Sequence, residues 1–295
     1  MNIYFHADDA GIDYEVTKRV INCWEENLIE GFSVIANESC YQIMKDSFNE
    51  NIHKEISLSV HLNLSDGKSL GSFSETYLLT DHNCNFSLGL LKLMFYLIVG
   101  SSKRKVFLQQ VYNEWEKQIL SVKKMAGDRR IFAIDGHNHI HMFPSLFSIA
   151  VELAQKHSIN KVRISKEFYF AERWIDYFKL YYLSNSIKRT LLWFLTRIIM
   201  NRKIIFSPKT EAIIGIQYSG HMLPEKVRAG INKTKKKNMK SVEIIFHPGR
   251  ASYRGINNFA STKSARKFFL SYWRAKEYES LKIIRNEFSR AGKSN

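Results

Sequence analysis

The chain has 295 residues, of which 45% are hydrophobic and 24% are charged, and this balance excludes a wholly disordered protein. Lysine and arginine outnumber aspartate and glutamate by 44 to 28, so the net charge of +16 favours an anionic partner such as a membrane surface, a phosphorylated substrate or nucleic acid. The three cysteines have no CxxC spacing and the start carries no charged-then-apolar leader, so we expect a reducing, cytoplasmic location.

Strands and helices alternate along nearly the whole chain, which predicts an α/β fold. Because repeated β/α units bring the carboxyl ends of parallel strands to one face, we expect a deformed (β/α) barrel of seven or eight units with its site on that face. No linker or repeat is visible, so we predict one domain over 1–295, with an insertion at about 65–105. The predicted elements are strands over 1–8, 31–37, 56–61, 131–134, 161–164, 212–217 and 242–247, and helices over 14–29, 106–125, from Pro144 onward, and 262–289.

Two apolar segments interrupt this pattern, at 87–99 and 177–200. The first is shorter than the roughly 20 residues that a membrane span needs, and basic residues interrupt the second, so neither should span. The second belongs to a basic, aromatic helical segment at about 172–205, whose composition is typical of a helix lying at a membrane surface. The alternative is an ordinary barrel helix with a wide buried face.

The first chemical motif, His6-Ala7-Asp8-Asp9, follows the first strand. Adjacent carboxylates repel, so one is normally held by a cation and the other can act as a base. The alternative is a pair of caps for the following helix. His61 ends the third strand, and Asn63 two residues later would face the same pocket if the chain stays extended.

The strongest local signal is Asp135-Gly136-His137-Asn138-His139-Ile140-His141. Three imidazoles at alternate positions project to one side of an extended chain, and a buried core histidine explains one of them but not three. Histidine is the commonest metal ligand, and its second nitrogen needs an acceptor such as a carboxylate. The motif therefore indicates a metal or catalytic site.

The last motif, His247-Pro248-Gly249, ends the seventh strand, four residues after Glu243. His247 could serve as a general acid, with Pro-Gly turning the chain away from the site. The alternative is a buried turn histidine.

Together, Ala7-Asp8-Asp9, His61-Leu62-Asn63-Leu64, the histidine motif with Met142-Phe143-Pro144, and His247-Pro248-Gly249 resemble the YdjC-like carbohydrate deacetylases, the chitooligosaccharide deacetylase group. The resemblance implies a deformed barrel, one divalent metal ion and hydrolysis of an N-acetyl group on an amino sugar. By position it implies Asp9, His61 and His137 as metal ligands, Asp8 as the base and His247 as the acid. The remaining polar residues would contact substrate or orient the ligands: Asn63, Asp135, His139, His141 and Glu243.

The chain departs from the family pattern near the expected sugar pocket. His6 and Ala10 stand where the family usually has Asn and an aromatic residue, Gly136 where it has Ser, and Ala133 where it often has His. The segment 177–203, with the residues that follow it, resembles the hopanoid-associated branch, whose substrates carry lipids. These features concern the substrate more than the reaction.

We therefore expect a metal-dependent deacetylase acting on a lipid-linked or anionic glycan at the cytoplasmic membrane face. Nitrogen ligands favour Zn²⁺, and Mg²⁺ is the alternative. A soluble deacetylase of free or phosphorylated oligosaccharides is the first alternative function. A non-haem iron oxygenase is disfavoured because the three ligands lie on separate β/α units. A non-catalytic nucleic-acid or membrane-binding module is suggested only by the charge, and no RNA-binding signature accompanies it, so nucleic acid is an unlikely partner.

Overall fold

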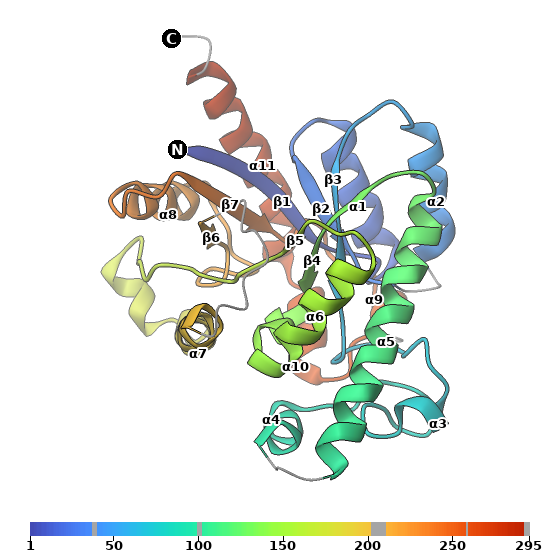
Figure 1. Ribbon diagram of the computed structural model, residues 1–295. Helices are drawn as coiled ribbons and strands as arrows, with labels where there is room; N and C mark the ends of the chain where they lie inside the picture. The colour runs from blue at the N-terminus through green and yellow to red at the C-terminus, as the bar shows by residue number, and fades with distance from the viewer. Residues whose placement is uncertain (37–39, 99–101, 202–210, 258, 292–295) are drawn as a thin grey trace.

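The computed structural model describes residues 1–36, 40–98, 102–201, 211–257 and 259–291 (Figure 1). Its strands form one sheet in the order β5-β4-β3-β2-β1-β7-β6, and every pair is parallel. The strands are β1 (Asn2–Ala10), β2 (Gly31–Val34), β3 (Ser57–Leu62), β4 (Ile131–Gly136), β5 (Lys161–Val162), β6 (Ala212–Ile214) and β7 (Ser241–Phe246).

The sheet curls into a half-barrel, which confirms the predicted deformed barrel and fixes the number of strands at seven within the described residues. β5 and β6 are its edges, and the chain after β5 bridges the gap between them. The backbone N–H of Ile213 donates to the carbonyl of Lys166 at 2.9 Å. The Glu167 carboxylate accepts hydrogen bonds from the N–H groups of Gly215 and Gln217, both at 2.7 Å. A buried carboxylate therefore ties the two edges together where a ladder is missing.

Helices cover the outside of the sheet: α1 packs on β1, α5 on β3, α6 on β4 and β5, and α8 on β6 and β7. The helices are α1 (Tyr14–Glu25), α2 (Tyr41–Glu50), α3 (Phe73–Thr76), α4 (Leu90–Ile98), α5 (Ser102–Ala126), α6 (Pro144–Lys156), α7 (Leu180–Asn201), α8 (Pro224–Lys235), α9 (Tyr253–Asn257), α10 (Lys263–Phe269) and α11 (Tyr272–Ala291). Two 3-10 helices, at His137–Met142 and Trp174–Phe178, complete the described elements.

The predicted last helix over 262–289 is wrong, because the structure has two helices there, α10 and α11. Thr262 caps the first, and the Ser271 hydroxyl accepts a hydrogen bond from the N–H of Trp273 at the start of the second. The predicted insertion contains α3 and α4. Asn37 of the second predicted strand, residues 99–101 of the insertion and residues 202–205 of the basic segment lie outside the described residues. The one-domain organisation over 1–295 stays a prediction.

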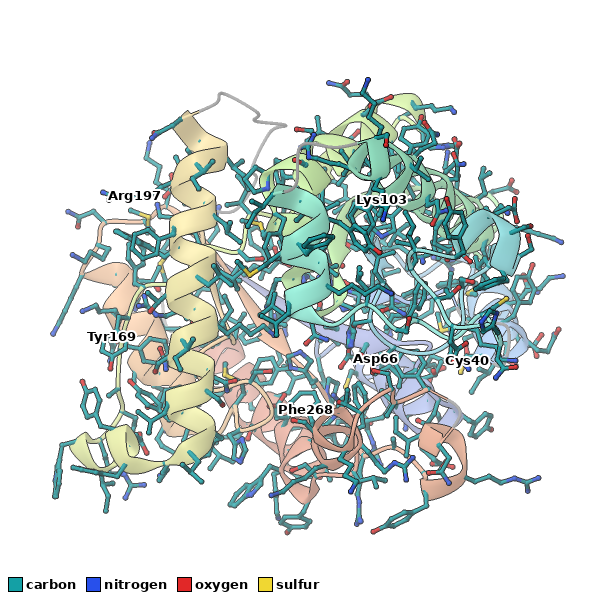
Figure 2. The ribbon with its side chains drawn as sticks, turned by 90° about the horizontal axis from the view of Figure 1, so that it is seen from below. Cys40, Asp66, Lys103, Tyr169, Arg197 and Phe268 are labelled. Atoms are coloured by element: carbon teal, nitrogen blue, oxygen red, sulfur yellow. The ribbon has the colours of Figure 1, made fainter. Side chains whose placement is uncertain are left out.

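The carboxyl ends of the strands meet at one face, beneath which α4, α7 and α10 lie in Figure 1. A cleft of about 2660 Å³ opens there, lined by residues of all four predicted motifs. Figure 2 looks onto this face, with Asp66 and Phe268 near its centre. Within the described part of the chain, no helix combines the length and the apolar character that a membrane span requires.

Candidate functional site

A bulge at the end of β1 brings two adjacent carboxylates to the cleft. Asp9 has a left-handed φ of 76°, and the register of β1 against β2 shifts between Ala7 and Ala10. An unusual φ of this kind costs about 1–3 kcal/mol and persists only where surrounding contacts enforce it. Since the bulge interrupts the strand's alternation, the side chains of Asp8 and Asp9 both line the same cleft.

Asp9, His61 and His137 form the first of two buried clusters, the Asp9 cluster. One ligand atom from each lies within 4.8 Å of the other two. Asp9 Oδ1 is 3.1 Å from His137 Nδ1 and 3.6 Å from His61 Nε2. The other oxygen, Oδ2, accepts a hydrogen bond from Arg274 Nη1 at 2.8 Å. One carboxylate oxygen and two imidazole nitrogens are donors that a divalent metal accepts, so these residues fit the expected ion.

Each histidine of the Asp9 cluster has its other ring nitrogen against a second carboxylate. His61 Nδ1 lies 2.6 Å from Asp135 Oδ1, across neighbouring positions of β3 and β4. His137 Nε2 lies 3.4 Å from Asp66 Oδ2. Asn63 holds Asp66 in place, because its side-chain oxygen accepts the Asp66 N–H at 3.3 Å. Carboxylates in this position fix the tautomer and orientation of metal-binding histidines.

His6, Asp8 and Asp135 form the second cluster, the Asp8 cluster, in which one ligand atom from each residue again lies within 4.8 Å of the other two. A guanidinium already stands among its carboxylates. Arg163 Nη1 lies 3.0 and 2.9 Å from the two oxygens of Asp8, and Nη2 lies 3.0 Å from Asp135. Glu243 binds the same guanidinium through Nε at 3.0 Å and Nη2 at 2.7 Å. Arg163 therefore supplies the positive charge that neutralises these acids. Glu243 contributes to the cluster by holding the Arg163 guanidinium in place.

The three histidines after Asp135 do not alternate along an extended chain, so that expectation is wrong. Residues 137–142 form a 3-10 helix, and Asn138 and His139 have left-handed φ values of 54° and 56°. Only His137 reaches the Asp9 cluster. His139 lines the cleft, with Nδ1 2.8 Å from the Ser165 hydroxyl. His141 is fully buried, with Nε2 2.8 Å from the Arg163 carbonyl.

The tight turn also explains why residue 136 is glycine in this chain. A Cβ at Gly136 would lie 2.6 Å from His141 Nδ1. His141 occupies the space that a side chain at position 136 would need, so a serine there would displace it.

His247 lines the cleft and is held from behind by α11. Its backbone N–H donates to Glu277 Oε2 at 2.6 Å, and its Nδ1 has no hydrogen-bond partner among the described residues. Burial lowers the pKa of His247 to about 4, although Asp9 opposes this. Burial also raises the pKa of Glu277 to about 7, although the hydrogen bonds that its carboxylate accepts from two backbone N–H groups lower this pKa. At neutral pH, His247 is thus an uncharged imidazole facing the cleft.

Carboxylates around the Asp9 cluster favour the protonated form of its two histidines. Burial raises the pKa of the Asp9 carboxyl, but Arg274 and the two histidines outweigh burial and hold it well below its usual value. Burial lowers the pKa of His61, but the Asp135 and Asp8 carboxylates outweigh burial and raise it to about 10. The pKa of His137 is raised for the same kind of reason, by Asp66 and Asp9. A metal ion that binds the nitrogens of these two histidines must therefore displace their protons.

Three residues that build the site were missed by sequence analysis: Asp66, Arg163 and Arg274. Arg163 follows β5, so a charged residue at a strand end was a usable signal. Asp66 lies in a Ser-Asp-Gly turn after the third strand, which reads as an ordinary loop. Arg274 belongs to a helix rich in charges and carries no local signal. His6, which belongs to the first motif but was given no role of its own, lies with Nε2 2.7 Å from the Ser33 hydroxyl within the Asp8 cluster.

Comparisons with known proteins identify the family of the chain. A carbohydrate deacetylase from Clostridium beijerinckii is 25% identical over 159 residues, which cover 54% of this chain and 58% of that protein, less than two thirds of its length. A crystal structure from Enterococcus faecalis, provisionally described as that of a cellobiose-phosphate cleavage protein, matches with a TM-score of 0.66 at 18% identity, over 96% of this chain and 94% of that one. This second likeness concerns the fold alone. The family model of the YdjC-like proteins matches residues 2–285, so the chain belongs to the YdjC-like family, as the motifs predicted.

Proposed function

We propose that this protein is a metal-dependent hydrolase that removes an N-acetyl group from an amino sugar. The observation that carries the proposal is the Asp9 cluster: three buried ligands at the base of an open cleft, with a further carboxylate, Asp8, lining the same cleft. The curated relative supports the reaction class, because its name is carbohydrate deacetylase. Asp9, His61 and His137 would hold the ion. When bound, a divalent ion polarises an amide carbonyl and lowers the pKa of water.

Asp8 would remove a proton from the attacking water. Arg163 binds both oxygens of Asp8, and the Ser33 hydroxyl donates to Oδ1 at 3.2 Å. A carboxylate has about four acceptor positions, so Oδ2, with Arg163 as its donor among the described residues, can also accept from a substrate water. Arg163 thereby holds the base in one orientation.

His247 would deliver a proton to the departing amine. The water oxygen adds to the acyl carbon, the carbon–nitrogen bond breaks, and the products are acetate and a free amine. Because His247 is uncharged at neutral pH, this role requires it to gain a proton during turnover. Asn63, Asp66 and Asp135 would act by orienting the two histidine ligands, and His139 is placed to contact substrate.

The finer proposal is that the acetylated sugar is carried by a lipid-linked or otherwise anionic glycan at the cytoplasmic membrane face. Leucines of α4 and α7 line the cleft, and Lys188 lies among them with a pKa that burial lowers to about 8. Lys179, Lys267 and Arg254 line it as well. The alternative is a soluble deacetylase of free or phosphorylated oligosaccharides, for which the same basic side chains would bind phosphate.

A mass-spectrometric screen of acetylated amino sugars tests both the proposed reaction and the proposed substrate class. We expect the metal-loaded protein to remove about 42 mass units per acetyl group from at least one substrate, and the Asp8→Asn variant to do so far more slowly. Faster loss from lipid-linked than from free sugars supports the finer proposal, and the reverse order supports the soluble alternative. If a full panel of acetylated amino sugars, including phosphorylated ones, loses no acetyl group with Zn²⁺ or Mg²⁺ present, the deacetylase proposal is wrong.

A further inference from the structure

Helix α4 exposes apolar side chains that do not pack into the core. Leu91 is 84% exposed, Ile98 is 73% exposed, and Phe95 between them is 55% exposed. These residues recur every three or four positions, so they form one stripe along the helix. Leu93, on the opposite face, is buried in the core. α4 is therefore apolar on both sides.

Helix α7 repeats this arrangement over a greater length. Its buried face packs into the core through Tyr182, Leu192, Leu195 and Ile199. A second apolar stripe stays exposed, with steps of three or four residues apart from the two helical turns between Ile187 and Phe194. Leu180 is 84% exposed, Ile187 is 74% exposed and Phe194 is 55% exposed, and Leu183 and Ile198 continue the stripe. Monomeric soluble proteins rarely leave such stripes uncovered.

Both helices border the mouth of the cleft. Leu90 and Leu93 of α4 and Leu192 and Leu195 of α7 line it. Figures 1 and 2 show α4 and α7 on the same face, at the carboxyl ends of the strands. Because both helices line the cleft, a surface that covered the two stripes would lie next to the proposed active site.

The charges around the stripes select an anionic occupant. Neither α4 nor α7 contains an aspartate or glutamate. α4 carries Lys92 and α7 carries Arg197, whereas Lys188 and Arg189 of α7 bind Asn138 and the Glu167 carbonyl. The first residues of α5 add Lys103, Arg104 and Lys105. A second copy of the chain, docked symmetrically, would bring the same basic residues against each other, which disfavours self-association. Apolar stripes edged by basic residues are typical of surfaces that lie in a lipid interface.

We propose that the exposed faces of α4 and α7 form a membrane-docking surface for an anionic bilayer. It comprises Leu91, Phe95, Ile98, Leu180, Ile187 and Phe194, with the basic residues at its edge. Docked in this way, the cleft opens toward the lipid headgroups and receives its substrate from the membrane. The proposal of a membrane-borne substrate rests on the proposed function, whereas the docking itself does not.

Vesicle co-sedimentation tests the docking surface. Phosphatidylcholine vesicles with and without phosphatidylglycerol serve as probes, and we expect binding that requires the anionic lipid and weakens with salt. The combined variant Leu91→Ser, Ile187→Ser and Phe194→Ser should bind at least about tenfold more weakly. Burying a single apolar side chain in the bilayer contributes at least about tenfold to the affinity. The matched control Ile52→Ser with Ile283→Ser, exposed apolar residues elsewhere, should bind like the unaltered protein.

A second pair of variants separates local from general charge. Lys103→Gln with Arg197→Gln should weaken binding by about fivefold per residue, whereas Lys236→Gln with Lys237→Gln, beyond the end of α8, should have little effect. Circular dichroism shows that each variant is folded.

Equal binding to neutral and anionic vesicles, or unchanged binding of the serine variant, would overturn the proposal. So would a dimer that the serine variant converts to monomer without any vesicle binding, because the stripes would then be a protein interface. The readout involves no turnover. A failed sedimentation result therefore leaves the deacetylase proposal standing, and a failed acetyl screen leaves the docking result standing.

Discussion

The Asp9 and Asp8 clusters have similar residues, similar burial and similar spacing, yet they differ in what neutralises them. In the Asp8 cluster, Arg163 places its guanidinium among Asp8, Asp135 and Glu243. In the Asp9 cluster, Arg274 binds only one oxygen of Asp9 and leaves the other toward the two histidines. Ligand-type residues alone therefore do not identify a metal site. The position of the nearest internal cation decides which cluster has room for an ion.

The largest effect is expected when a ligand of the Asp9 cluster is removed. His137→Ala should lose bound metal and reduce turnover to background while the fold is retained, because alanine offers no atom that can bind the metal. Metal analysis of the purified variant measures this. His6→Asn, in the Asp8 cluster, is the matched control and should keep the full metal content. Full metal content in His137→Ala would reverse the assignment of the two clusters.

Asp8→Asn should separate the base from the ligands. We expect metal content to stay unchanged and the rate to fall by roughly 10²–10⁴-fold, the usual contribution of a general base. Steady-state kinetics together with metal analysis test this. A rate equal to that of the unaltered protein would show that Asp8 is only a partner of Arg163.

Arg163→Met should destabilise the fold by about 3–5 kcal/mol, because it leaves buried carboxylates without their cation. Urea unfolding measures the loss, and Arg163→Lys, which keeps the charge but not the forked geometry, should lose less. If Arg163→Met instead stays as stable as the parent and gains a second bound divalent ion, the Asp8 cluster is itself a competent metal site. Unchanged stability with no extra ion would show that the Arg163 charge is dispensable.

Asp66→Asn tests the orienting carboxylates and should weaken metal affinity by about 10–100-fold. Asp128→Asn, an exposed carboxylate outside the cleft, is the control. Isothermal titration calorimetry measures both. An affinity equal to the parent's would mean that the His137 ring is held by packing, for example against Phe269, and not by Asp66.

Counted over a single pH unit, the effect of pH is the smallest. His61 has a pKa raised to about 10 without metal, and a metal-bound histidine is neutral, so binding should release a proton. Apparent affinity should rise by about tenfold per pH unit until pH approaches that pKa. In the metal-free protein, the same shift stabilises the fold fully below about pH 6.5, and this contribution is lost as pH rises toward 10. Calorimetry in buffers of different ionisation enthalpy counts the protons, and a count of zero would contradict the protonated state of His61.

Much of the fold and part of the site could be predicted from the sequence. Apolar runs that end in Asp8, His61, Asp135 and His247 are strong signals, because parallel strands bring their carboxyl ends together. The neighbouring positions of His61 and Asp135 in β3 and β4 then follow. Left-handed backbone at Asp9, Asn138 and His139 could not be predicted, since nothing in those residue types requires it. Sequence periodicity likewise does not show that a guanidinium from a distant helix pairs with Asp9.

The pairing between Arg274 of α11 and Asp9 of β1 joins residues 265 positions apart. Glu277 of the same helix holds the backbone of His247. Asp9, His61 and His137 therefore emerge from the ribosome before α11 is synthesised. Until α11 has formed and docked, Arg274 does not restrain the Asp9 carboxylate. α11 acts as the closing element of the site: its docking completes the orientation of Asp9. A chain interrupted before residue 272 would carry Asp9, His61 and His137 without the helix that restrains Asp9.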